Sequence, residues 1–135
     1  MLVEKIDLLE SLCAVPGISG DEEAIKIFIL DYVSRESKNW LVQPKIIEGP
    51  ELQGGFLLVF GKPRTAVFSH IDTVGYTVGY GANLIKVGGP DTPSGSVLVG
   101  SDSSSEIRCE LHQDSNSEIS YLYHREIDRG TCLSY

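Results

Sequence analysis

A histidine and an aspartate two positions apart follow directly on an apolar, strand-like segment of the chain. They are His70 and Asp72, within the stretch AVFSHIDTVGY that covers residues 66–76. Residues two apart on a strand point to the same side, so both side chains can approach one site beyond the end of the strand. A neutral imidazole can bind a metal ion, and a nearby carboxylate can orient the ring and raise its basicity. The pair is also compatible with an ordinary polar strand end, and the two residues alone do not decide between these interpretations.

Two amphipathic helices are predicted before this motif. Apolar residues at helical spacing predict a helix over residues 3–14, and a Pro-Gly turn ends it. A second apolar stripe predicts a helix over residues 21–35, with Ser19 as its expected cap. Glu22 and Glu23 lie in the first turn of that helix, where acidic side chains stabilise the helix dipole. We therefore interpret them as structural residues and not as a catalytic pair.

Three strand-like segments lead into the motif. They are rich in β-branched and aromatic residues, are separated by Gly or Pro, and cover residues 40–47, 55–60 and 65–71. The last two lack the alternation of a half-exposed strand, which favours strands covered on both faces, as in an α/β sheet. Open α/β sheets bind their ligands beyond the carboxyl ends of the strands, where His70 and Asp72 would lie.

The character of the sequence changes after Gly75. Residues 76–121 consist of short strand-like runs with many glycines and serines and no helical period, which predicts a small all-β domain. The segments SDSSS and DSNSE within it are interpreted as solvated hairpin tips. We therefore expect an α/β catalytic domain formed by residues 1–75 and 122–135, with the β domain inserted between them.

The composition argues against several classes of function. The chain has 19 acidic and 11 basic side chains, a formal net charge of −8 and no Lys/Arg run, which opposes binding to nucleic acid or to an anionic membrane. No apolar run approaches the roughly 20 residues of a membrane span. The 3 cysteines are widely spaced, and the acidic N-terminal segment lacks signal-peptide features. These features predict a reduced, cytoplasmic protein.

The order of these features resembles the co-catalytic dinuclear metallopeptidases, and within them the glutamyl/leucyl aminopeptidase group that includes the tetrahedral aminopeptidases. The matching pieces are, in order, VPGISG, HIDTVG, the Gly-rich stretch with VGGPD, and EIDRG, so the resemblance extends over essentially the whole chain. It implies a zinc-peptidase-like α/β domain, with a mixed sheet and flanking helices, interrupted by a small all-β domain. It also implies a metal-dependent aminopeptidase that acts on peptides with a free N-terminus and uses two divalent metal ions, zinc or cobalt.

By this resemblance, three residues take roles in a metal centre. His70 would be a terminal ligand of one metal ion, Asp72 the catalytic carboxylate that supports this ligand, and Asp128 the aspartate that bridges both ions. Two neighbouring divalent cations need an anionic bridge, and a carboxylate supplies two oxygens. His112 and His124 are interpreted as surface histidines. The inserted β domain would carry the contacts of a homo-oligomer.

The chain departs from the family pattern near its end. Asp128 is followed by Arg129 and Gly130 where the family has Asp-Asp-Arg, and the interval after His70 is short for the family's inserted domain. The family's Glu-Glu pair, a further acidic ligand and a late histidine belong downstream of this point. We therefore expect the amino-terminal part of an enzyme, incompetent in catalysis by itself. Two alternatives stay open: a carboxypeptidase or amide deacylase of the related group, or an inactive interaction module.

Overall fold

The chain forms two compact units, which are described separately. The computed structural model describes residues 2–135, so Met1, where the expected catalytic domain begins, lies outside the described residues. The first unit contains the chain up to Val15 together with Glu22–Ile71, and the second contains Pro16–Asp21 together with Asp72–Tyr135. The short loop between the two helices therefore belongs to the second unit, although both helices belong to the first.

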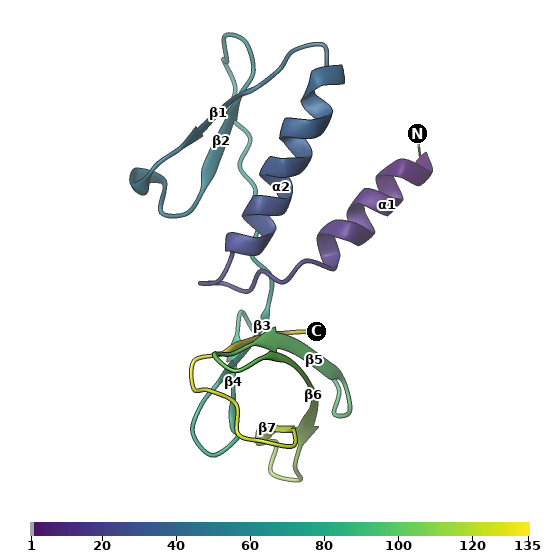
Figure 1. Cartoon of the computed structure of the whole chain (residues 1–135), viewed down its shortest axis with the longest axis vertical. Coiled ribbons are helices and arrows are strands. Elements are labelled where there is room, and N and C mark those ends of the chain that lie inside the picture. Colours follow the sequence, from purple (N-terminus) through teal and green to yellow (C-terminus); the bar gives the residue numbers. More distant parts are fainter. Residues whose placement is uncertain (1) are drawn as a thin grey trace. The chain divides into compact units, whose positions relative to one another are not determined.

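The first unit holds both helices and a β-hairpin (Figure 1). Helix α1 spans Leu2–Cys13 and helix α2 spans Glu23–Glu36, which confirms the two predicted helices. The remaining elements of this unit are η1 (Ser37–Asn39), β1 (Lys45–Glu48), η2 (Pro50–Leu52) and β2 (Phe56–Val59). Strands β1 and β2 pair antiparallel, with Lys45 opposite Val59 at one end of the hairpin.

Two side-chain contacts hold the parts of the first unit together. Lys26 on α2 forms an ion pair with Glu48 on β1, with 3.0 Å between Nζ and Oε1. The rings of Trp40 and Phe60, which flank the hairpin, stack with their centroids 6.2 Å apart. The ion pair thus links α2 to the hairpin, and the ring contact links the residues on either side of the hairpin.

The second unit is a six-stranded antiparallel sheet. Its strands are β3 (Gly75–Val78), β4 (Leu84–Val87), β5 (Val97–Ser101), β6 (Glu106–Gln113), β7 (Ile119–Leu122) and β8 (Cys132–Ser134), in the spatial order β4-β3-β8-β5-β6-β7. The two outer strands approach each other, because Asn83 forms a bridge with Ser120 and the Tyr121 N–H donates to the Ala82 carbonyl at 3.1 Å. The sheet is therefore nearly closed on itself, as the ring of strands in Figure 1 shows.

Apolar side chains fill the interior of this curved sheet. Strand β6 shows how the sequence produces the arrangement: Ile107, Cys109 and Leu111 are buried, and the residues between them are exposed. The buried residues of this core are Tyr76, Val78, Leu84, Leu98, Ile107, Cys109, Leu111, Tyr121, Ile127 and Leu133. Because a closed sheet brings all its inward-facing side chains together, strands of three to eight residues suffice to bury them.

The predicted α/β fold is wrong. A mixed sheet with flanking helices required residues 65–71 as a strand with neighbours on both sides, but this segment is extended without strand pairing. Val67 and Phe68 within it are 92% and 88% exposed. In the described part of the chain, every pair of named strands is antiparallel, and the protein is mostly β. An apolar run without alternation is compatible with a doubly covered strand, but the run itself does not supply the covering elements.

The second unit includes residues 122–135 as well as the expected β domain. Residues 76–121 contain only strands and connecting turns, and β3 to β7 run through them. Residues 122–135 were expected to return to the helix-containing part, yet the structure assigns them to the second unit. There β8 lies between β3 and β5 and pairs with both. The last strand in the sequence is thus an interior strand of the six-stranded sheet.

The loop between the helices is anchored in the second unit through Ile18. This side chain is 2% exposed, and Ile18 forms a parallel bridge with Thr73. A Cβ added to Gly75 would collide with the Cγ2 atom of Ile18. Glycine at position 75 therefore makes room for the isoleucine, and the isoleucine closes over the first strand of the sheet.

Replacing Ile18 by alanine should destabilise the second unit by about 2–4 kcal/mol, because a buried isoleucine is removed and the space above Gly75 is not refilled. Urea denaturation followed by amide exchange at Leu98 and Leu111 measures this loss in the core of the sheet. Ile85→Ala is the matched control, since Ile85 lies in the same unit and is 58% exposed. Equal effects of the two substitutions would contradict an anchoring role for Ile18.

Candidate functional site

The predicted His-x-Asp motif lies where the chain passes from the first unit to the second. His70 is exposed, at the end of the extended segment, and Asp72 is half-buried as the first residue of the segment that continues into β3. The Thr73 N–H donates to the Gly17 carbonyl at 2.7 Å, and the Thr73 hydroxyl donates to the same oxygen at 3.2 Å. The chain is therefore fixed to the 16–21 loop directly after the motif.

The carboxylate of Asp72 is held by Ser19, which lies 53 positions earlier in the chain. The Ser19 hydroxyl donates to Asp72 Oδ2 with 2.5 Å between the two oxygens. Ser19 does not serve as the predicted cap, because α2 is capped by Glu22 and has no side-chain cap hydrogen bond. The sequence predicted Ser19 only as a helix cap, and the folded chain alone identifies Asp72 as its partner.

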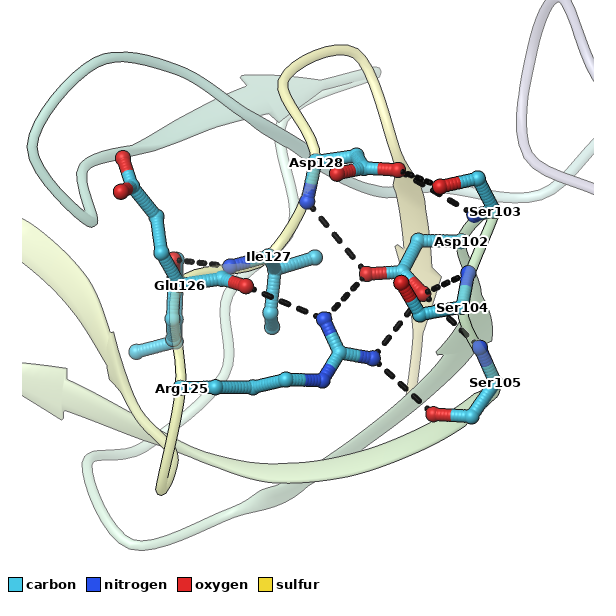
Figure 2. A network of polar contacts seen from close by, with 9 residues as sticks. Asp102, Ser103, Ser104, Ser105, Arg125, Glu126, Ile127 and Asp128 are labelled. Carbon is cyan, nitrogen blue, oxygen red and sulfur yellow. Dashed lines mark hydrogen bonds and ion pairs between the residues drawn. The ribbon is translucent and has the colours of Figure 1, made fainter.

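A second polar network surrounds Asp102 in the turn between β5 and β6 (Figure 2). Arg125 Nη1 donates to Asp102 Oδ2 at 2.5 Å and Arg125 Nη2 donates to Oδ1 at 2.9 Å, so the guanidinium binds both oxygens. The N–H groups of Ser104 and Ser105 donate to Oδ1 at 2.9 and 3.0 Å. Arg125 also donates to the Ser105 hydroxyl at 2.9 Å and to the Glu126 carbonyl at 3.0 Å.

The electrostatics of this network centre on one ion pair. The Arg125 guanidinium, assisted by backbone N–H groups, holds the pKa of Asp102 well below its usual value of 3.8, although desolvation acts in the opposite direction. The same contact raises the pKa of Arg125. The Asp102 side chain is 0% exposed and that of Arg125 is 27% exposed. A fork-like guanidinium that binds both carboxylate oxygens fixes orientation as well as charge, so the pair joins the 102–105 turn to the 123–128 segment.

Asp128 belongs to the edge of this network. Its Oδ2 atom accepts hydrogen bonds from the Ser103 hydroxyl and from the Ser103 N–H, the latter at 3.2 Å. Its own N–H donates to Asp102 Oδ2 at 3.4 Å. One oxygen of the predicted bridging carboxylate is thus engaged by a serine of the neighbouring turn. The side chain of Asp128 is exposed, and its predicted role as a metal ligand stays a prediction.

The SDSSS segment is only partly the solvated hairpin tip that its composition predicts. Ser103, Ser104 and Ser105 are exposed. Asp102, which directly follows β5, is inaccessible at its side chain and forms the ion pair with Arg125. An Asp two residues before a serine in a turn is a known signal for a side chain that caps its own turn, and this signal points to Asp102. Nothing in the sequence around Arg125 identifies it as the partner.

The described residues do not gather into a complete metal centre. Within residues 2–135, no three His, Cys, Asp or Glu side chains lie close enough together to hold a metal ion. The His124 ring packs against Tyr123 with centroids 4.2 Å apart, and His112 is exposed on β6, in agreement with the surface role expected for both.

Comparisons with known proteins do not assign a family. No family model matches the chain, and no curated protein matches its sequence. None of the helices among the described residues is long and apolar enough to cross a membrane.

Asp102→Asn should destabilise the second unit near neutral pH and much less in strong acid. The folded-state pKa of Asp102 lies below its unfolded value, so the stabilisation is complete above the unfolded pKa and is lost as pH falls toward the folded one. The difference in unfolding free energy between the two proteins should be constant between about pH 5 and pH 7 and should narrow below about pH 4. Chemical denaturation at a series of pH values measures it.

Asp114→Asn provides the control for this experiment. Asp114 also caps a hairpin turn, and its Oδ1 accepts hydrogen bonds from the backbone N–H groups of Asn116 at 2.9 Å and Glu118 at 2.8 Å. Asp114→Asn therefore removes the cap of a turn without breaking an ion pair, and it shows how much of the loss in Asp102→Asn comes from turn capping alone. If Asp102→Asn lowers the free energy of unfolding by the same amount at neutral pH and in strong acid, the ion pair between Asp102 and Arg125 is not the source of the stabilisation.

Proposed function

We propose that the chain contributes to a cytoplasmic metal-dependent aminopeptidase, in which His70 supplies an imidazole ligand and Asp72 orients it. The observation that carries this proposal is the hydrogen bond from Ser19 to Asp72, which joins the VPGISG and HIDTVG segments. These are the first two motifs in the order that resembles the glutamyl/leucyl aminopeptidase group. Their contact in space supports the view that they form one site and are not unrelated turns.

The chemistry of the joined residues suits the orientation of a metal ligand. A histidine binds a divalent cation through a neutral ring nitrogen, and a carboxylate nearby sets the ring orientation and its basicity. Such a carboxylate is effective only if its own orientation is limited. The hydrogen bond from Ser19 limits the orientation of the Asp72 carboxylate at Oδ2. The hydrogen bond from the Thr73 N–H to the Gly17 carbonyl limits the position of the neighbouring main chain.

The proposal assigns this chain a part of the centre and not the whole. Two zinc or cobalt ions would need several ligands beyond His70 and Asp128, and they would come from polypeptide other than the described residues. Asp128 could take part only through its second oxygen or by giving up its bonds from Ser103. The residues of this chain bind and orient, and the general base of the reaction is not assigned to any of them.

Assembly into a homo-oligomer through the second unit is part of the same proposal. The apolar side chains that such an assembly would cover are Tyr80, Ile85 and Leu122, all of them exposed. They belong to the hairpin of β3 and β4 and to β7, which include the outer strands of the sheet. Outer strands with apolar side chains are common places for contact between protein chains.

One observation favours a second candidate, a binding module without catalytic activity. Val67 and Phe68 are almost fully exposed in an extended segment, and apolar side chains exposed side by side are typical of surfaces that contact a partner. This candidate predicts no dependence on metal ions. The two candidates therefore differ in a property that can be measured directly.

Manganese titration followed by nuclear magnetic resonance should locate a weak metal site at His70. Paramagnetic broadening is expected first at residues 69–73, because the imidazole of His70 is exposed and Asp72 lies beside it in the sequence. His70→Ala should remove this broadening, whereas the control His112→Ala should not, since His112 is exposed on β6. Tight binding of two zinc equivalents, lost in His70→Ala, would instead show that the centre is complete in this chain.

Hydrolysis by the native protein, purified from its source, tests the proposed reaction. Release of the N-terminal residue from aminoacyl amides should be stimulated by zinc or cobalt, because a divalent metal ion provides the Lewis acid and activates water. Cleavage of N-acyl amides in place of aminoacyl amides would assign the carboxypeptidase or deacylase class. If neither substrate is cleaved with added metal, the binding module is the correct function.

A further inference from the structure

The segment of residues 65–69 in the first unit is extended and has no strand partner. It belongs to a run, residues 61–70, in which every residue is exposed, and Val67 and Phe68 within it are 92% and 88% exposed. Among the described residues, none is joined to residues 65–68 by a backbone hydrogen bond. Successive residues of a strand face opposite sides, so this segment offers one large apolar side chain to each side. Its pattern fits a strand that pairs with another backbone and is covered on both faces.

Strand β1 offers an edge of matching character. The hairpin of β1 and β2 is a two-stranded sheet, so within residues 2–135 the outer edge of β1 has no neighbouring strand. On one face of the hairpin Ile46 lies opposite Leu58, and on the other face Ile47 lies opposite Leu57. Both isoleucines are only half-buried. An edge with unpaired N–H and C=O groups is a template for a further strand, and here that strand would meet apolar side chains on both faces.

The charges at the ends of the two segments favour one direction of pairing. Lys62 and Arg64 directly precede the 65–69 segment, whereas Glu48 ends β1 and Glu51 follows it in η2. In an antiparallel addition the start of the segment meets the end of β1, so the two cations approach the two carboxylates. In a parallel addition the cations would instead meet Lys45 at the start of β1. Like charges opposite each other destabilise a sheet, so the antiparallel arrangement is preferred.

The outer edge of β2 is disfavoured by the same argument. Strand β2 ends at Val59 and is followed by the loop that contains Lys62 and Arg64. An antiparallel strand at this edge would bring the cations of one copy against those of the other. A parallel strand there would pair less stably per residue.

The segment cannot reach the outer edge of β1 in its own chain. A strand antiparallel to β1 runs parallel to β2, because β1 and β2 are themselves antiparallel. Parallel strands need a crossover connection of about a dozen residues or more, whereas only residues 60–64 lie between β2 and the segment. A second copy is free of this restriction. It also offers the same edge and the same segment, so the exchange can be reciprocal about a two-fold axis.

We infer that residues 65–69 add as an antiparallel strand to the outer edge of β1 in a second copy of this chain. The register that brings apolar side chains together sets Val67 opposite Ile47 on one face and Phe68 opposite Ile46 on the other. This contact lies entirely within the first units of the two copies. It requires no metal ion and is separate from the proposed assembly through the second unit.

Sedimentation equilibrium of the 135-residue chain tests the association. Each copy carries a net charge of −8, so the experiment is done at about 0.15 M salt, where exposed charges are screened beyond about 8 Å. The wild type should form a reversible dimer. Phe68→Ser should raise its dissociation constant by about a hundredfold or more, because each dimer buries two of these side chains.

The substitution at Phe68 should leave the single copy intact, since this side chain is exposed in it. Circular dichroism and chemical denaturation of the monomer check this point. Leu9→Ser is the matched control, because Leu9 is a 60% exposed apolar residue on α1 of the same unit. It should leave the dissociation constant unchanged.

A charge exchange tests the direction of the added strand. Arg64→Glu should weaken the dimer by about three- to tenfold, and the double substitution Arg64→Glu with Glu51→Arg should recover most of the loss. Glu51 is chosen because Glu48 already forms an ion pair with Lys26 at 3.0 Å. A double variant no better than Arg64→Glu alone would contradict the antiparallel arrangement.

Cross-linking tests the register. Ser69 and Lys45 lie opposite each other in the proposed pairing, and both are exposed in the single copy. Copies with Ser69→Cys, mixed with copies with Lys45→Cys, should form a disulfide-linked heterodimer under mild oxidation. Both carry Cys13→Ser, which removes the exposed native thiol. Asp31→Cys, at an exposed position of α2, replaces Lys45→Cys in the control and should not cross-link.

Three results overturn the inference. One is a wild type that stays monomeric at millimolar concentration. Another is a dimer whose dissociation constant is unchanged by Phe68→Ser, because the association then uses a different surface, such as the exposed apolar side chains of the second unit. The third is equal cross-linking of Ser69→Cys to Lys45→Cys and to Asp31→Cys. None of these results bears on metal binding, so the proposed function is tested separately.

Discussion

The pairing of the 16–21 loop with Thr73 is the contact on which the candidate site depends. It brings two segments together that are separated in the chain by both sheet strands of the first unit and by α2. The pairing buries Ile18 and brings the Ser19 hydroxyl to the Asp72 carboxylate. It can form because Gly75 has no Cβ, which would collide with the Ile18 side chain. A change in this pairing would therefore alter the core of the second unit and the orientation of the candidate ligand group at once.

Asp102, Asp72 and Asp128 of the second unit differ in their burial and in the groups that donate hydrogen bonds to them. Asp102 is inaccessible, binds a guanidinium through both oxygens and accepts backbone N–H groups as well, so its bonding capacity is used within the fold. Asp72 is half-buried, and its Oδ2 accepts a hydrogen bond from the Ser19 hydroxyl. Asp128 lies between these cases, exposed but bonded to Ser103.

The extended segment before the motif explains why the α/β expectation failed. Its composition is that of a buried strand, and Val67 and Phe68 would be covered on both faces of a sheet. A strand forms, however, only where another backbone pairs with it. In this structure β1 and β2 form a two-stranded antiparallel hairpin, and residues 65–71 do not add to either of its edges. Hairpin partners are close in sequence and form with a small loss of chain entropy, whereas a mixed sheet requires longer connections.

Local features of this protein were determined by its sequence alone. Both helices were predicted because a 3.6-residue apolar period is a property of neighbouring residues, and β6 buries alternate residues as its pattern indicates. The tertiary structure alone decided which distant groups meet: Ser19 with Asp72, Arg125 with Asp102, and β8 with β3 and β5. No periodicity encodes such pairs, because each partner is equally compatible with many others until the chain has closed its sheet. Residue types could therefore nominate His70 and Asp72, but only the fold supplied the serine that holds the aspartate.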